Sequence, residues 1–226
     1  MLRFAAVFVL ILSTVALAQL SPDVKAFVSV DAPTVALTHV KLIDGAGAPP
    51  RDDQTIVIAN GRIQMIGDAA KTSVPGEAKV LDLHGCTVIP GLIGMHDHLF
   101  YPAGGGWFTE MGYSFPRLYL AAGVTTIRTT GSTEPYADIE LKKQIDSGKA
   151  PGPKIGVTGP YLEGEGSFAI QMHALTGPED ARKTVAFWAD QGTTSYKAYM
   201  FITRAELGAA IEEAHKRGPP VPRSCN

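Results

Sequence analysis

Two histidines separated by a single residue, His96 and His98, are the feature of the sequence best suited to chemistry. They follow the apolar run 88–95 and precede a glycine-rich segment, 103–106. Alternate residues of a β-strand point to the same side, so the two imidazoles can face one ion while Asp97 points away. Imidazole nitrogen is a good ligand for zinc and neighbouring transition metals. Taken alone, the pair is also compatible with two polar residues at a strand end.

Lys197 is the second residue whose surroundings suggest a chemical role. It lies among aromatic residues in the strand-like run 195–199. Burial disfavours a charged ammonium group, so it would lower the lysine pKa from about 10.4 toward a neutral, nucleophilic amine. The alternative is an ordinary lysine at a sheet edge whose stem reaches solvent.

Other polar residues are weaker candidates for contact with a substrate. His173 lies in a loop after the third predicted strand, and Arg128 ends the second. Either side chain could bind a substrate group, and either could equally be an ordinary surface residue. Glu163, Glu165 and the glycines between and beside them predict a flexible acidic loop near His173.

Alternating strand and helix patterns position these residues. Alternation of this kind predicts parallel strands joined by right-handed crossovers, and in parallel α/β folds the sites lie at the carboxyl ends of the strands. Thr203 and Glu206 form a capping box that predicts the start of the last helix. Strands are expected at 88–95, 123–129, 154–158 and 193–199, and helices at 115–122, 136–147, 178–191 and 205–216.

A small β unit precedes this region. Asn60 and Gly61 separate two alternating runs and predict a hairpin with a type I′ turn. So few strands cannot bury two faces alone, so the unit should pack on another part of the chain. Its strands are expected at 36–42, 55–59, 62–66 and 79–83.

The first 18 residues predict a signal peptide. Arg3 supplies a positive charge, 4–12 is apolar, and Ala16 and Ala18 form a small-residue cleavage pattern. An N-terminal membrane anchor is the alternative, but the apolar stretch is shorter than the roughly 20 residues that a spanning helix needs. We therefore expect cleavage, export to the periplasm or the exterior, and no stable membrane insertion afterwards.

Composition limits the remaining classes of protein. The 226 residues are 45% hydrophobic and 19% charged, as in globular proteins, and the formal net charge of −2 gives no reason to expect a nucleic-acid partner. A small-molecule substrate is the expected partner. Two cysteines, Cys86 and Cys225, are too few for a disulfide scaffold. We expect Cys86 to be an inert buried thiol.

Several segments together resemble the amidohydrolase superfamily of metal-dependent hydrolases. The run 88–98 looks like its strand-one signature, and 56–67 with 80–85 looks like the small β-sandwich lobe of many members. The segment 123–128 is similar to strand two of the imidazolonepropionase-like and prolidase-like branch, and Lys197 lies in a run similar to strand four. The resemblance extends over about residues 36–218.

The resemblance implies a fold and a set of site residues. The fold would be α/β: the first four βα units of a (β/α)₈ TIM-like barrel in residues 89–226, a β-sandwich lobe in 19–88, and the signal peptide in 1–18. His96 and His98 would bind the first metal, and Lys197 would react with carbon dioxide to form a carbamate that bridges two metals. The cofactor would be one or two divalent ions, with zinc the expected metal, and the reaction would be hydrolysis of an amide, lactam or dipeptide-type C–N bond by metal-activated water.

The sequence departs from the family pattern after residue 217. The family's histidines after strands five and six, and its proton-transferring aspartate after strand eight, cannot be assigned here, so no catalytic general base is assigned. Three prolines in 219–222 are poor material for a central strand. We expect an incomplete and inactive fragment whose open barrel edges favour self-association.

Two other classes of protein compete with this interpretation. One is a non-catalytic half-barrel that serves as a binding or assembly module. The other is a Rossmann-like nucleotide binder, which is disfavoured because no G-x-G-x-x-G lies between a strand and a helix. The substrate cannot be named from the sequence.

Overall fold

The computed structural model describes residues 20–217. The predicted signal peptide, 1–18, and Cys225 lie outside these residues. Within residues 20–217, no helix is both long and apolar enough to cross a membrane.

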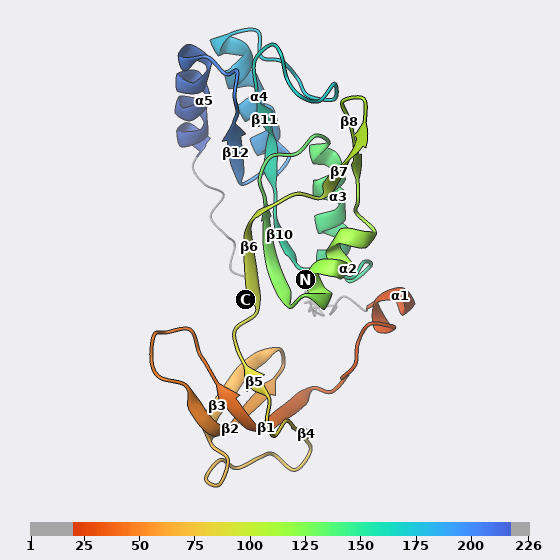
Figure 1. Cartoon of the computed structure of the whole chain (residues 1–226), viewed down its shortest axis with the longest axis vertical. Coiled ribbons are helices and arrows are strands. Elements are labelled where there is room, and N and C mark those ends of the chain that lie inside the picture. The colour runs from red at the N-terminus through yellow and green to blue at the C-terminus, as the bar shows by residue number, and fades with distance from the viewer. Residues whose placement is uncertain (1–19, 218–226) are drawn as a thin grey trace, which may run out of the picture.

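A five-stranded sheet forms the first part of the structure (Figure 1). β1, β2 and β3 are antiparallel, whereas β4 and β5 each pair parallel to β1. Val40, Leu42 and Ile56 form its buried core. The elements are α1 (Pro22–Lys25), β1 (Thr34–Leu42), β2 (Arg51–Ala59), β3 (Arg62–Asp68), β4 (Lys79–Asp82) and β5 (Thr87–Val88).

The turns of this sheet test two predictions. Asn60 and Gly61 have φ values of 50° and 70° and join β2 to β3, which confirms the hairpin. Cys86 is exposed, so the prediction of a buried thiol was wrong. It follows Gly85, whose φ is 83°, in the turn between β4 and β5, where the chain faces solvent rather than the core.

Parallel strands and helices alternate in the second part. β6, β9 and β10 form one parallel sheet in the order β10-β9-β6, and β11 pairs parallel to β12. The predicted alternation is confirmed, although the expected strand 154–158 continues as β11. The result is a mixed α/β structure of several small sheets, and residues 20–217 do not close a barrel. The elements are β6 (Leu92–Asp97), α2 (Ser114–Ala121), β9 (Val124–Thr129), α3 (Pro135–Asp146), β10 (Lys154–Gly156), β11 (Thr158–Leu162), α4 (Pro178–Asp190), β12 (Ser195–Ala198) and α5 (Arg204–Arg217).

An antiparallel hairpin that the sequence patterns did not predict follows β6 directly. It consists of β7 (Phe100–Gly104) and β8 (Trp107–Glu110). Gly104, Gly105 and Gly106 all have positive φ, which the tight turn requires and which side chains rarely adopt. The glycine-rich segment is therefore the tip of a hairpin.

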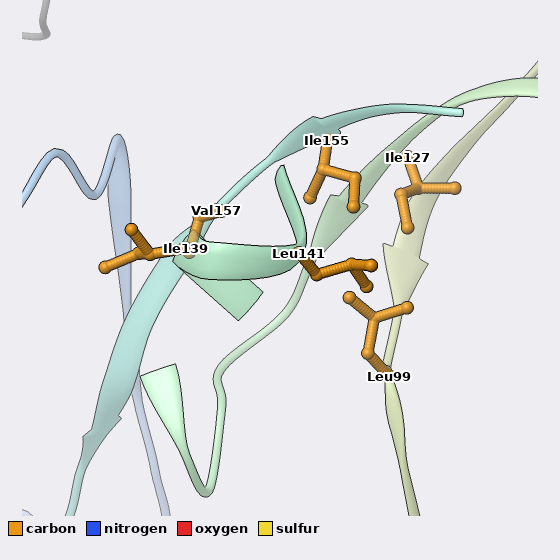
Figure 2. Close-up of a cluster of buried hydrophobic side chains, with 6 residues drawn as sticks. All are labelled: Leu99, Ile127, Ile139, Leu141, Ile155 and Val157. Atoms are coloured by element: carbon orange, nitrogen blue, oxygen red, sulfur yellow. The ribbon is translucent and has the colours of Figure 1, made fainter. Parts of the chain in front are cut away.

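Two apolar clusters stabilise the parallel strands. The first lies between α3 and the strands β9 to β11, where Figure 2 shows its six side chains. The second joins α4, α5 and β11 through small residues such as Ala181, Val185 and Ala209. Fully burying one valine, leucine or isoleucine side chain contributes about 1.5–3 kcal/mol to stability. The first cluster consists of Leu99, Ile127, Ile139, Leu141, Ile155 and Val157.

The predicted capping box starts the last helix. The Thr203 amide and hydroxyl donate to Glu206 Oε2 at 2.9 and 2.8 Å, and the Glu206 amide donates back to Thr203 Oγ1 at 3.3 Å. This reciprocal pattern satisfies amides that the first helical turn leaves free.

Candidate active site

His96 and His98 lie together at the carboxyl end of β6. Their ring centroids are 5.5 Å apart, with the rings nearly perpendicular. His96 is exposed on the strand, whereas His98, the first residue after it, is half-buried. His98 Nδ1 is buried and has no hydrogen-bond partner in the described residues. A buried ring nitrogen without a partner is a donor atom that an ion could use.

The Asp97 carboxylate, between the two histidines in the sequence, lies against Gly94. It is so close to Gly94 that any side chain there would collide with it, and its Oδ2 has no hydrogen-bond partner within residues 20–217. Tyr119 of α2 donates to the His98 carbonyl at 3.3 Å, and burial, followed by the neighbouring Asp97 carboxylate, raises the pKa of Tyr119 to about 12. Tyr119 thus holds the end of β6 that carries the histidine pair.

Lys197 occupies the middle of β12. It pairs with Tyr161 of β11, and its Nζ lies 5.2 Å from the ring centroid of Tyr161 and 5.3 Å from that of Tyr199. The side chain is half-buried, and this burial, together with the nearby Arg128 charge, lowers the pKa of Lys197 below its ordinary value. A lowered pKa favours the neutral amine, which is the form that reacts with electrophiles.

Tyr161 connects the lysine with the histidine pair. Its ring stacks on His98 with centroids 6.3 Å apart, and Lys197 lies over the same ring. Burial lowers the pKa of His98, the nearby Gly131 backbone opposes this shift, and the neighbouring Lys197 lowers the pKa further. The structure therefore brings together the three residues that the sequence predicted as metal ligands.

Arg128 lies near this group at the end of β9. Its Nε donates to the Met95 carbonyl at 3.2 Å. None of the ion pairs formed within residues 20–217 includes Arg128 or Lys197. The two cations give this region a positive charge that suits an anionic group.

His173 lies in the loop between β11 and α4, apart from the histidine pair. Its Nε2 is 2.8 Å from Asp180 Oδ2, which also accepts from the Thr176 amide at 3.0 Å. The hydrogen bond of His173 therefore goes to Asp180 and not to the histidine pair. Next to it is a cavity of about 550 Å³, lined in part by Tyr136 and Trp188.

A chain of aromatic rings beside the site was missed by the sequence patterns. Between ring centroids, Phe100 is 4.7 Å from His98, Phe108 is 5.4 Å from Phe100, and Phe168 is 5.2 Å from Phe108. The Gln171 side chain accepts from the Phe108 amide at 3.0 Å and donates to its carbonyl at 2.7 Å, which fixes the β7–β8 hairpin to the loop after β11. The aromatic residues recur in the sequence, but nothing in their spacing connects these two segments.

The acidic loop also differs from its prediction. Glu165 is exposed, but Glu163 has an exposed fraction of 0% and its Oε1 accepts from backbone amides. Glu163 is therefore part of the packed end of β11 and not of a flexible acidic loop.

The donor set fits a metal ion in part. Two adjacent imidazoles and the free Nδ1 of His98 suit a zinc-type ion. Lys197 as an ammonium group is not a ligand, but its carbamate would supply carboxylate oxygens. Within residues 20–217, no three histidine, cysteine, aspartate or glutamate side chains gather in an arrangement that could hold a metal.

Comparisons by sequence give dihydroorotases. No family model matches the chain. It is 31% identical over 165 residues to the dihydroorotase of Leifsonia xyli subsp. xyli, covering 70% of this chain and 34% of that protein. The dihydroorotase of Syntrophotalea carbinolica is 30% identical over 138 residues, which are 58% of this chain and 31% of that protein. The chain thus spans about a third of the length of these relatives.

Comparisons with solved structures extend over more of the chain. A protein from Bifidobacterium longum, provisionally named a prolidase, matches with a TM-score of 0.68 and 33% identity over 83% of this chain and 48% of that one. An Xaa-Pro dipeptidase with bound methionine matches with a TM-score of 0.68 and 23% identity over 82% of this chain and 55% of that one. The chain spans about half of each structure.

Proposed function

Because the chain belongs to the amidohydrolase superfamily, we propose that it serves in metal-dependent hydrolysis of an amide, lactam or dipeptide-type C–N bond. The named relatives support this range, since dihydroorotases and an Xaa-Pro dipeptidase are among them. The substrate would be a small molecule. The observation that carries the proposal is that His98 and Lys197 both lie against the Tyr161 ring, while His98 Nδ1 has no hydrogen-bond partner within residues 20–217.

The proposal gives each of these side chains a role. His96 and His98 would hold the first divalent ion, zinc in the first instance. The neutral amine of Lys197 would attack carbon dioxide to form a carbamate with release of one proton, and the carbamate oxygens would be further ligands. The chemistry that such an ion supplies when bound is a lower pKa for a water molecule and polarisation of the substrate carbonyl. Arg128 offers its positive charge to an anionic group of the substrate.

The proposed architecture is the first four βα units of a (β/α)₈ barrel, with the five-stranded sheet as its β-sandwich lobe. The similarity to longer structures, of which this chain covers 48% and 55%, supports it. On this proposal residues 20–217 supply one side of the metal centre. We expect residues 1–226 alone to be catalytically inactive.

A hydrolysis assay tests the proposed reaction. The purified chain is incubated with zinc, bicarbonate, and either Xaa-Pro dipeptides or cyclic amides, and products are measured by mass spectrometry. We expect no turnover above background. Turnover that is abolished by a chelator and by His98→Ala would support the metal mechanism, but it would refute our expectation that the chain alone is inactive. Turnover that survives both changes would refute the metal mechanism.

A binding or assembly module is the second candidate function. Ile93 and Met95 on β6 have exposed fractions of 63% and 60%, and within residues 20–217 β12 pairs with a neighbour on one edge only. Exposed apolar strands with free edges favour association with another chain. Dimers that form without metal and dissociate in Met95→Lys, measured by light scattering after size-exclusion chromatography, would favour this candidate. A monomeric chain would exclude self-assembly.

Export is a further part of the proposal. It rests on the signal-peptide pattern of residues 1–18. Cell fractionation followed by mass spectrometry should find a mature chain that begins at Gln19 outside the cytoplasm. A cytoplasmic chain that retains Met1 would contradict it.

A further inference from the structure

Glu163 is a buried carboxylate at the carboxyl end of β11. Its exposed fraction is 0%. Oε1 accepts from the Gly164 amide at 3.1 Å and from the Phe201 amide at 2.5 Å, while Oε2 is buried and has no partner in the part of the chain that the structure describes. An unpartnered buried carboxylate oxygen is costly, so a carboxylate at this place calls for a reason beyond packing.

The Phe201 amide belongs to the segment that follows the lysine strand. β12 pairs with β11 through Lys197 opposite Tyr161, and the ladder adds one more bond, from the Tyr199 amide to the Leu162 carbonyl at 3.0 Å. Beyond that point, the Glu163 side chain replaces the backbone as the acceptor. The carboxylate therefore extends the pairing of the two strands past the end of β12.

The two segments approach each other closely at this point. A side chain at Gly164 would collide with the Phe201 carbonyl, so glycine is required there. The β11–β12 ladder also has a register irregularity between Thr158 and Tyr161. On the amino side of Lys197 the Thr194 amide donates to the Val157 carbonyl at 2.8 Å, so the contacts of Glu163 fix the lysine strand from its other, carboxyl side.

We propose that Glu163 is a positioning residue for Lys197, which it holds over the Tyr161 and Tyr199 rings by fixing the end of β12 through the Phe201 amide. The proposal rests on the proposed role of Lys197 as a carbamate ligand. It assigns Glu163 no contact with metal or substrate. The length of the side chain, and not its charge, is the property that matters. A glutamine can accept the same two hydrogen bonds, whereas an aspartate is one methylene too short to accept both.

Nuclear magnetic resonance of the metal-free chain tests this role. Lysine labelled with ¹³C at the ε-carbon reports ring-current shifts, and Lys197→Arg identifies the Lys197 signal. Because the Lys197 amine lies 5.2 and 5.3 Å from two ring centroids, we expect its ε-protons to be shifted upfield. Glu163→Asp should remove most of that shift and make hydrogen exchange of the Phe201 amide about tenfold faster, as expected for the loss of one hydrogen bond.

Matched variants separate positioning from general stability. Glu163→Gln should keep both signals, and Glu165→Asp, in the same loop but exposed, should change neither. If Glu163→Asp does not fold, Gly164→Ala displaces the Phe201 segment with the carboxylate intact and should also move the Lys197 signal. The proposal would be overturned if the Lys197 signal were unchanged in Glu163→Asp, or in Gly164→Ala when that variant is used. It would also be overturned if Glu163→Gln and Glu163→Asp lost the upfield shift of Lys197 equally. The readout needs no metal, so failure of metal binding is detected separately.

Discussion

The strands beneath α3 and the strands that carry the predicted ligands are built differently. β10 and β11 are separated by one residue and pair with β9 on one side and with β12 on the other, so β9 to β11 are inner strands and β6 and β12 are edge strands. Ile127, Ile155 and Val157 of this inner region have exposed fractions of 4% or less, whereas Ile93 of β6 is 63% exposed. The predicted ligands lie on or directly after the edge strands. Packing therefore stabilises the middle of this region, and single polar contacts, such as those of Tyr119 and Glu163, hold the groups suited to chemistry.

The largest expected loss of stability comes from a cavity in the inner region. Ile127→Ala should lower the free energy of unfolding by about 3 kcal/mol, since it leaves a cavity beside α3. Ile93→Ala removes the same atoms from an edge strand and should cost less than about 0.5 kcal/mol. Urea denaturation measures both. Equal losses would contradict the difference between inner and edge strands.

Replacing Gly94 by alanine should destabilise the edge strand β6 through a single contact. Gly94→Ala places a side chain against the Asp97 carboxylate and should cost about 2 kcal/mol. Gly76→Ala, where nothing lies within 4 Å, is the matched control. Thermal unfolding should show partial rescue in the double variant Gly94→Ala, Asp97→Ala. No rescue would mean that the collision is not with Asp97.

A smaller effect on stability is expected from pH, through two acids: half-buried Glu110 at the end of β8 and buried Asp138 of α3. Burial, with the nearby Asp138 and Glu134 charges, raises the pKa of Glu110 to about 8, and burial raises the pKa of Asp138 to about 7. The folded state thus binds more protons than the unfolded state, whose acids titrate near pH 4. Stability should fall as the pH rises through the window between about pH 4 and pH 8.

The measurement compares urea denaturation at about pH 5 and about pH 9 in the wild type and in Glu110→Gln. Because Glu110 keeps some contact with solvent, we expect the variant to remove only about 1 kcal/mol of the fall. Stability that rises with pH across this window would show that these acids are ionised in the folded chain.

The smallest effect concerns His173. Its ion pair with Asp180 is largely exposed, so His173→Gln should change the free energy of unfolding by no more than about 0.5 kcal/mol. Calorimetric titration with zinc should give the same affinity as the wild type, because His173 bonds to Asp180 and not to the histidine pair. A loss of zinc affinity would place His173 in the metal site.

The sequence predicted local structure well where one pattern was sufficient. The Asn60-Gly61 hairpin and the Thr203-Glu206 capping box depend on neighbouring residues, and both are present. The adjacency of His96 and His98 follows in the same way from their spacing. The contact of Lys197 with Tyr161, by contrast, needs the pairing of two strands more than thirty residues apart.

The missed features depend on contacts between distant segments. Gln171 fixes the β7–β8 hairpin from 63 residues away, and Glu163 bonds to an amide 38 residues later. Glu163 stands directly before Gly164, Glu165 and Gly166, a run with the composition of a loop, so only the packing of β11 against the segment after β12 reveals its burial. The aromatic chain from Phe100 to Tyr199 was missed for the same reason.

The central claim is that His98 and Lys197 belong to one metal site. Its most direct test is the metal content of the purified chain, measured by inductively coupled plasma mass spectrometry after dialysis with zinc and bicarbonate. The account predicts bound zinc in the wild type and in the control His215→Ala, and its loss in both His98→Ala and Lys197→Ala. Equal zinc content in the wild type and these two variants would contradict it.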